Sequence, residues 1–188
     1  MLNNCLKFFR YSLSRLVLFL MRWKVRSTVL PERAIYVFAP HTSYWDGFFL
    51  WVTSWCLKEK FLALLWHGVY DKAPWFFRRC GFIPVYPSGR RALRSVYQFA
   101  ARNEDFRLVI SPEGNRDRDI WKMSFYHLAK KFNMPIVLIA VDYCSKTITC
   151  DSCVYPSNDF KADCAQIASF YEGVVAKHPD KFANIQVG

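Results

Sequence analysis

The chain has 188 residues, 53% of them hydrophobic, which is enough for one globular domain whose core needs no disulfide or metal. Seven Gly and nine Pro without a low-complexity tract exclude a fibrous or disordered protein. Lys and Arg number 26 against 15 Asp and Glu, and the resulting charge of +11 predicts a polyanionic partner: a phosphorylated substrate, an acidic membrane or nucleic acid.

Residues 1–30 are predicted to form a basic amphipathic helix that lies on a membrane surface. Apolar residues recur every three or four positions, which places them on one side of a helix. They are Leu2, Leu6, Phe9, Leu13, Leu16, Val17 and Leu20. The basic residues off this side are Lys7, Arg10, Arg15, Arg22 and Arg26. Such a helix binds anionic bilayers through apolar burial and charge. The alternative is that the apolar side packs on the protein's own core.

Residues 31–188 are predicted to form one α/β domain. Runs of β-branched and aromatic residues predict strands at 35–39, 61–66, 82–86, 106–110, 135–141 and 146–151. Helices are predicted at 46–57, 90–102, 120–132 and 160–177. This alternation is typical of a single three-layer domain with a mixed, partly parallel sheet flanked by helices.

The seven cysteines do not follow a metal-binding pattern. Cys150 and Cys153 form a Cys-x-x-Cys pair, but no second pair has ribbon spacing and no His lies nearby, so we expect no metal. The first residues do not resemble a secretory leader, because charges interrupt the apolar run, and no run reaches the ~20 residues of a membrane span. We therefore expect reduced thiols and a peripheral, monotopic protein on the cytoplasmic face of a membrane.

A His and an Asp lie five positions apart after the first predicted strand of the domain. Ligands of α/β proteins bind at the carboxyl ends of strands. Across this turn the carboxylate of Asp46 can hold one imidazole nitrogen of His41 and leave the other free as a general base. A His that only satisfies a turn is the alternative for this pattern taken alone.

Two further segments can bind anions. Glu113-Gly114-Asn115-Arg116 follows a predicted strand, where the Gly admits a ligand close to the backbone and the Arg offers a planar fork for phosphate. Arg90, Arg91 and Arg94 belong to a stretch from 72 to 103 with seven basic residues and no acid. A charged surface turn and a solvated helix face are the alternatives.

In chain order, these segments resemble the lysophospholipid and glycerolipid acyltransferase family. His41 to Asp46 is similar to its His-x4-Asp block, 81–85 to its second block, 112–116 to its Pro-Glu-Gly-Thr-Arg block, and 134–137 to its fourth. The resemblance covers about residues 34–143. Asn115 stands where the family usually has Thr, and Tyr86-Pro87 stand where an acidic residue and an Arg usually hold the acceptor phosphate.

The resemblance implies a membrane-surface O-acyltransferase. It would move a fatty acyl group from acyl-CoA or acyl carrier protein to a lyso-glycerolipid hydroxyl, with 1-acylglycerol-3-phosphate as the expected acceptor and no further cofactor. His41 would act as general base and Asp46 would orient it. The four residues 113–116 would hold the acceptor, with Arg90, Arg91 or Arg94 supplying the missing charge.

Three other functions fit parts of the pattern. A hydrolase would use the same His–Asp pair on water, and a non-catalytic lipid-surface protein would keep only the fold. A serine hydrolase is disfavoured, because no Gly-x-Ser-x-Gly occurs. Nucleic-acid binding would explain the charge, but no RNA-binding signature or zinc finger is present, so we expect no nucleic-acid partner.

Overall fold

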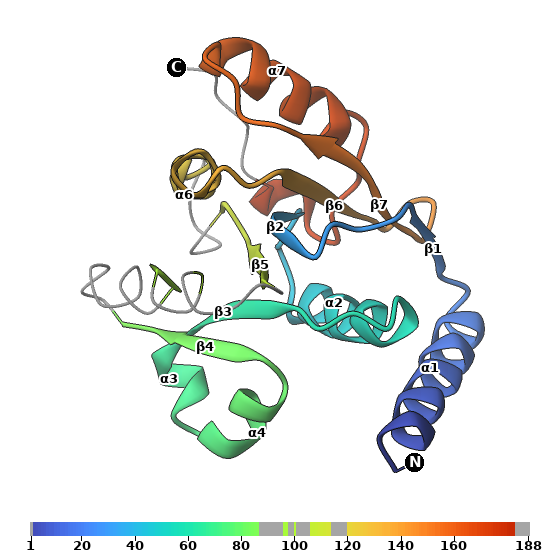
Figure 1. The fold of residues 1–188 in the computed structure, drawn as a ribbon. Helices are drawn as coiled ribbons and strands as arrows, with labels where there is room; N and C mark the ends of the chain where they lie inside the picture. Colours follow the sequence, from blue (N-terminus) through green and yellow to red (C-terminus); the bar gives the residue numbers. More distant parts are fainter. Residues whose placement is uncertain (1, 87–95, 98–99, 101–105, 114–119, 183–188) are drawn as a thin grey trace.

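The computed structural model describes residues 2–86, 96–97, 100, 106–113 and 120–182. Within this part of the chain, one seven-stranded sheet has the order β1-β7-β6-β2-β5-β3-β4 (Figure 1). The strands are β1 (Lys24–Ser27), β2 (Arg33–Ala39), β3 (Leu62–Trp66), β4 (Phe82–Val85), β5 (Phe106–Ile110), β6 (Ile136–Asp142) and β7 (Thr147–Val154). Only β6 and β7 pair antiparallel among these, so the predicted mixed and mostly parallel sheet is confirmed.

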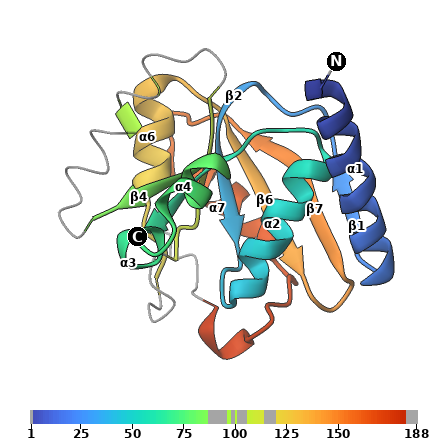
Figure 2. The same ribbon diagram turned by 90° about the horizontal axis from the view of Figure 1, so that it is seen from below.

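Helices cover both faces of the sheet. They are α1 (Leu2–Leu20), α2 (Tyr44–Cys56), α3 (His67–Tyr70), α4 (Pro74–Arg79), α6 (Ser124–Phe132) and α7 (Phe160–Tyr171), followed by the 3₁₀ turn η1 (Pro179–Lys181). Helices α6 and α7 pack in one core cluster, and α1 and α2 pack in the other. Figure 2 shows α1 beside α2, and the two helices are in contact. The predicted three-layer architecture is thus confirmed.

Strand β2 lies in the middle of the sheet and is buried on both sides. Side chains of a strand alternate between faces, so Ile35 and Val37 pack with α6 and α7 while Tyr36 and Phe38 pack with α2. A continuous apolar run is what a parallel strand needs when helices cover both of its faces. This strand places the residues that follow it at the carboxyl edge of the sheet.

Two predicted helices are shorter than expected. The helix predicted from residue 120 begins at Ser124, because the preceding segment pairs with the loop after β5 through the Lys122 N–H, which donates to the Pro112 carbonyl at 2.9 Å. The helix predicted to reach residue 177 ends at Tyr171, because Gly173 has a φ of +76° and stops the helix there.

Sequence patterns missed β1, α3 and α4. Strand β1 is a largely exposed edge strand without an apolar run, and the two helices are shorter than two turns. Pro is common at the first position of a helix, so Pro74 could have predicted the start of α4. Of the helix predicted at 90–102, Val96, Tyr97 and Ala100 are helical, and the remainder lies outside the described residues.

Helix α1 contacts the domain mainly through a side that the apolar pattern did not predict, although Val17 of the predicted side also packs against the core. Ser14 and Leu18 are buried, and Lys58 lies 4.5 Å above the Tyr11 ring. The predicted apolar side remains 36–69% exposed at Leu6, Phe9, Leu13, Leu16 and Leu20. The alternative in which this side packs on the protein's own core is therefore wrong for these residues. Among the described residues, no helix is both long and apolar enough to cross a bilayer.

Candidate active site

The loop between β2 and α2 carries the predicted His–Asp pair. Helix α2 begins with a capping box: the Ser43 hydroxyl accepts from the Trp45 N–H at 3.3 Å, and Asp46 accepts from the Ser43 N–H at 2.7 Å. The helix predicted to begin at residue 46 begins at Tyr44, with Ser43 as its cap, and Asp46 closes the box from the first turn. This local structure fixes Asp46 beside the end of β2.

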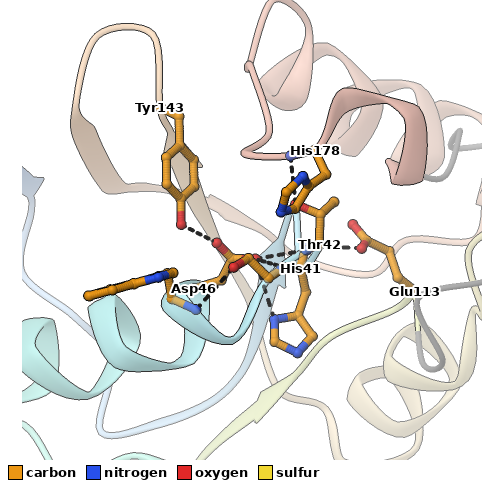
Figure 3. Close-up of polar contacts among 8 residues, drawn as sticks. His41, Thr42, Asp46, Glu113, Tyr143 and His178 are labelled. Carbon is orange, nitrogen blue, oxygen red and sulfur yellow. Dashed lines mark hydrogen bonds and ion pairs between the residues drawn. The ribbon is translucent and has the colours of Figure 1, made fainter.

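Asp46 is fully buried and holds three hydrogen bonds. Its Oδ2 accepts from the N–H groups of Thr42 and Ser43, both at 2.7 Å, and its Oδ1 accepts from the Tyr143 hydroxyl. The Nδ1 atom of His41 lies 3.8 Å from Asp46 Oδ2, and the other ring nitrogen points away from it (Figure 3). With a proton on Nδ1 facing the carboxylate, Nε2 is the nitrogen that can accept a proton. The His41 side chain is 27% exposed, so the ring is accessible to solvent.

Glu113 supports the backbone of His41 from the neighbouring strand. It follows β5, is 1% exposed, and its Oε2 accepts from the His41 N–H at 3.0 Å. Burial raises the pKa of the Glu113 carboxyl to about 7; the bond from His41 opposes this rise, and the charge of Asp46 adds to it. Glu113 therefore links the ends of β2 and β5 at the site.

The structure brings His41, Asp46 and Glu113 together, as their positions after β2 and β5 predicted. The other predicted site residues, Gly114, Asn115, Arg116, Arg90 and Arg91, lie outside the described residues.

The end of β6 and the C-terminal segment also contribute to the site, and no sequence pattern predicted this. Tyr143 follows β6 and bonds to Asp46. The His178 N–H donates to Thr42 Oγ1 at 3.3 Å, and Lys177 Nζ lies 5.0 Å above the Trp45 ring. These residues are far from the His–Asp block in the sequence, and no local pattern links them to it.

An open apolar groove lies beside the pair. Met21, Tyr44, Trp45 and Phe48 line about 430 Å³ between the end of α1 and the start of α2. Two of these residues, Tyr44 and Trp45, stand between His41 and Asp46 in the chain, so the groove adjoins the start of α2. Among the described residues, no cluster of three or more His, Cys, Asp or Glu side chains is arranged to hold a metal ion.

This α/β sheet carries a His and a buried Asp at the carboxyl edge of its central strand, an arrangement in which the imidazole can accept a proton. The sequence model of the Acyltransferase family matches residues 22–142, and the chain belongs to that family. The family predicted from the four sequence blocks is confirmed, and the protein is an acyltransferase.

A solved structure shares the fold. The crystal structure of the 1-acyl-sn-glycerophosphate (LPA) acyltransferase, PlsC, from Thermotoga maritima superposes with a TM-score of 0.56 over 81% of this chain and 70% of that chain, at 13% identity. At this identity the likeness is one of fold. No curated protein matches the chain in a sequence search.

Proposed function

We propose that the protein is a membrane-surface O-acyltransferase that moves a fatty acyl group from acyl-CoA or acyl carrier protein to the hydroxyl of a lyso-glycerolipid. The proposed acceptor is 1-acylglycerol-3-phosphate. The observation that carries the proposal is the 3.8 Å approach of His41 Nδ1 to the buried Asp46 carboxylate, in a chain of the Acyltransferase family. The PlsC structure, which has the same fold, is that of an LPA acyltransferase.

The proposed reaction uses His41 as base and then as acid. Asp46 keeps a proton on Nδ1, and Nε2 takes the proton from the acceptor hydroxyl as its oxygen attacks the thioester carbonyl. The tetrahedral intermediate collapses, the carbon–sulfur bond breaks, and the imidazolium returns the proton to the leaving thiolate. An ester and a free thiol form, and no acyl-enzyme is needed. Direct transfer of this kind requires that both substrates are held together.

The apolar groove and the flanking cations supply the proposed binding contacts. An acyl chain lying against Trp45 and Phe48 would bring its carbonyl toward His41. Arg116, Gly114 and Asn115 are proposed to hold the acceptor. In the second block, Tyr86-Pro87 replace the residues that usually hold the acceptor phosphate, and Arg90 or Arg91 is proposed to supply the missing positive charge.

Helix α1 is proposed to bind an anionic phospholipid surface on the cytoplasmic face. Its exposed apolar side, together with a net charge of +11, combines the two attractions that hold interfacial helices on acidic bilayers. The groove begins where α1 ends, at Met21, so the proposed site opens beside the surface from which a lyso-lipid would come.

Mass spectrometry of the reaction products tests the function and separates it from its alternatives. Purified protein is incubated on anionic vesicles with a palmitoyl donor, either palmitoyl-CoA or palmitoyl-acyl carrier protein. Separate reactions contain lysophosphatidate, lysophosphatidylcholine or monoacylglycerol as acceptor. The proposal predicts phosphatidate from lysophosphatidate at the highest rate. Free fatty acid as the sole product would instead identify a hydrolase, and no product from any acceptor or donor would identify a lipid-surface binding protein.

A further inference from the structure

Tyr143 reaches the candidate site from the neighbouring strand. β2 and β6 pair in parallel, with Ala39 opposite Ala140, so both strands end at the same edge of the sheet. The Tyr143 hydroxyl donates to Asp46 Oδ1 (Figure 3). We propose that Tyr143 is a positioning residue, which holds the Asp46 carboxylate in place and sets the basicity of His41. This inference rests on the proposed acyl transfer.

The Tyr143 ring is itself held in one orientation. It packs edge-on against Trp23, with ring centres 5.1 Å apart, and against Phe49 at 6.0 Å. Its backbone N–H donates to the Val175 carbonyl at 2.9 Å. Because packing and backbone contacts fix the ring, the hydroxyl is aimed at Asp46 before any substrate arrives, as precise positioning requires.

The two oxygens of Asp46 have different partners. Oδ2 accepts two backbone N–H groups and faces His41, while Oδ1 accepts from Tyr143. Loss of the phenol would leave a buried oxygen without that donor and free the carboxylate to rotate. It would also concentrate negative charge on the carboxylate, which stabilises the imidazolium and raises the pKa of His41.

The phenol remains a donor over the working pH range. Burial, the hydrogen bond to Asp46 and the Asp46 charge together raise the pKa of Tyr143 far above its usual value. Within the part of the chain that the structure describes, the other charged or titratable residues that contact residues 41–45 are Glu113, behind the His41 backbone, and His178 and Lys177, which contact Thr42 and Trp45. Glu113 also titrates near pH 7, so a pH–rate profile alone would not separate it from His41. The pKa of His41 is therefore measured by NMR from its own imidazole signal, which is assigned by its absence in His41→Ala.

The chain contains a matched control. Tyr126 on α6 donates to Asp163 Oδ2 on α7 at 2.7 Å, which is a second buried Tyr–Asp hydrogen bond in the core cluster on the other face of the sheet. Tyr126→Phe deletes the same chemical group at the same kind of bond. This variant therefore measures how much the loss of a buried phenol hydroxyl changes kcat and the His41 pKa when the hydroxyl has only a structural role.

The experiment compares Tyr143→Phe, Tyr126→Phe and the wild type by steady-state acyl transfer from palmitoyl-CoA to lysophosphatidate and by NMR titration. Tyr143→Phe should lower kcat roughly tenfold. It should raise the pKa of His41 by about half a unit to one unit, and it should raise the apparent pKa of the acid limb of the kcat/KM–pH profile by the same amount. Tyr126→Phe should change neither. Trifluorotyrosine at position 143, a stronger donor that preserves the packing, should lower the His41 pKa.

A wild-type kcat and His41 pKa in folded Tyr143→Phe would overturn the proposal. Equal shifts in Tyr126→Phe, or an unchanged His41 pKa with trifluorotyrosine, would also overturn it. If the wild type itself makes no product, the proposed function fails, while the NMR titration still decides whether Tyr143 controls His41.

Discussion

Replacing Glu113 with Gln should remove a pH-dependent loss of stability. Burial raises the pKa of the Glu113 carboxyl from 4.5 to about 7. Because the folded-state pKa is the higher one, Glu113 contributes stability that is fully present below the unfolded pKa and is lost as pH rises through about 7. At about 1.4 kcal/mol per pKa unit, this contribution is about 3 kcal/mol.

The assay is urea unfolding followed by tryptophan fluorescence, from about pH 4 to about pH 8. Gln retains an oxygen for the His41 N–H but cannot ionise. Over this range the unfolding free energy of the wild type should fall by about 3 kcal/mol relative to that of Glu113→Gln. Glu172→Gln, which removes an exposed carboxylate, should keep the wild-type pH dependence. If the unfolding free energies of the wild type and Glu113→Gln depend on pH in the same way, the pKa of Glu113 is not raised by burial, and the prediction is wrong.

Three other predictions test separate parts of the structure. Asp46→Asn should lower kcat/KM by about 10² to 10⁴ while circular dichroism stays native, because the Asn oxygen can still accept from the Ser43 N–H and close the capping box but no longer stabilises an imidazolium. A smaller loss would contradict the role of the carboxylate. Gly81→Ala should lower the unfolding free energy by about 2 kcal/mol or more, because Gly81 has a φ of +88° and an added methyl carbon would lie 2.5 Å from a backbone oxygen. Unchanged urea unfolding would contradict this. Replacing the exposed Leu16 and Leu20 together with Ser should weaken sedimentation with anionic vesicles about thirtyfold without altering unfolding. Leu18→Ser, in contrast, should destabilise the fold by about 3 kcal/mol, and equal vesicle binding by all variants would exclude α1 as the membrane contact.

The central strands could be predicted from the sequence because burial on both faces requires a continuous apolar run. β2 and β6 meet this condition, and both were predicted within one or two residues. β1 was missed because an exposed edge strand of four residues, Lys24–Ser27, imposes no hydrophobic pattern. Helix ends were missed where a tertiary contact decided them, as at Lys122, or where a glycine signal went unused, as at Gly173.

The same distinction applies to the candidate site. His41 and Asp46 lie on one turn, so their spacing alone predicted that they are close. Tyr143 is 97 positions from Asp46 and meets it only because β6 pairs with β2. The bond from the His41 N–H to Glu113 likewise depends on the pairing of β2 with β5.

Helix α1 shows what a periodic pattern can and cannot predict. The pattern predicted an apolar side, and the structure has it. Which surface that side meets depends on the opposite contact, made by the small Ser14 and by Leu18 against the domain. A single polar residue such as Ser14 carries no hydrophobic signal, so the docking side was not visible in the sequence.

The central claim is that His41 is the general base for acyl transfer to a lipid hydroxyl. The most direct measurement is the rate of diacyl-lipid formation by His41→Ala, with the wild type as reference and vesicle binding measured in parallel. If His41 is the general base, His41→Ala should bind vesicles like the wild type, and its kcat/KM should fall by about 10² to 10⁴. Product formation by His41→Ala at the wild-type rate would contradict it.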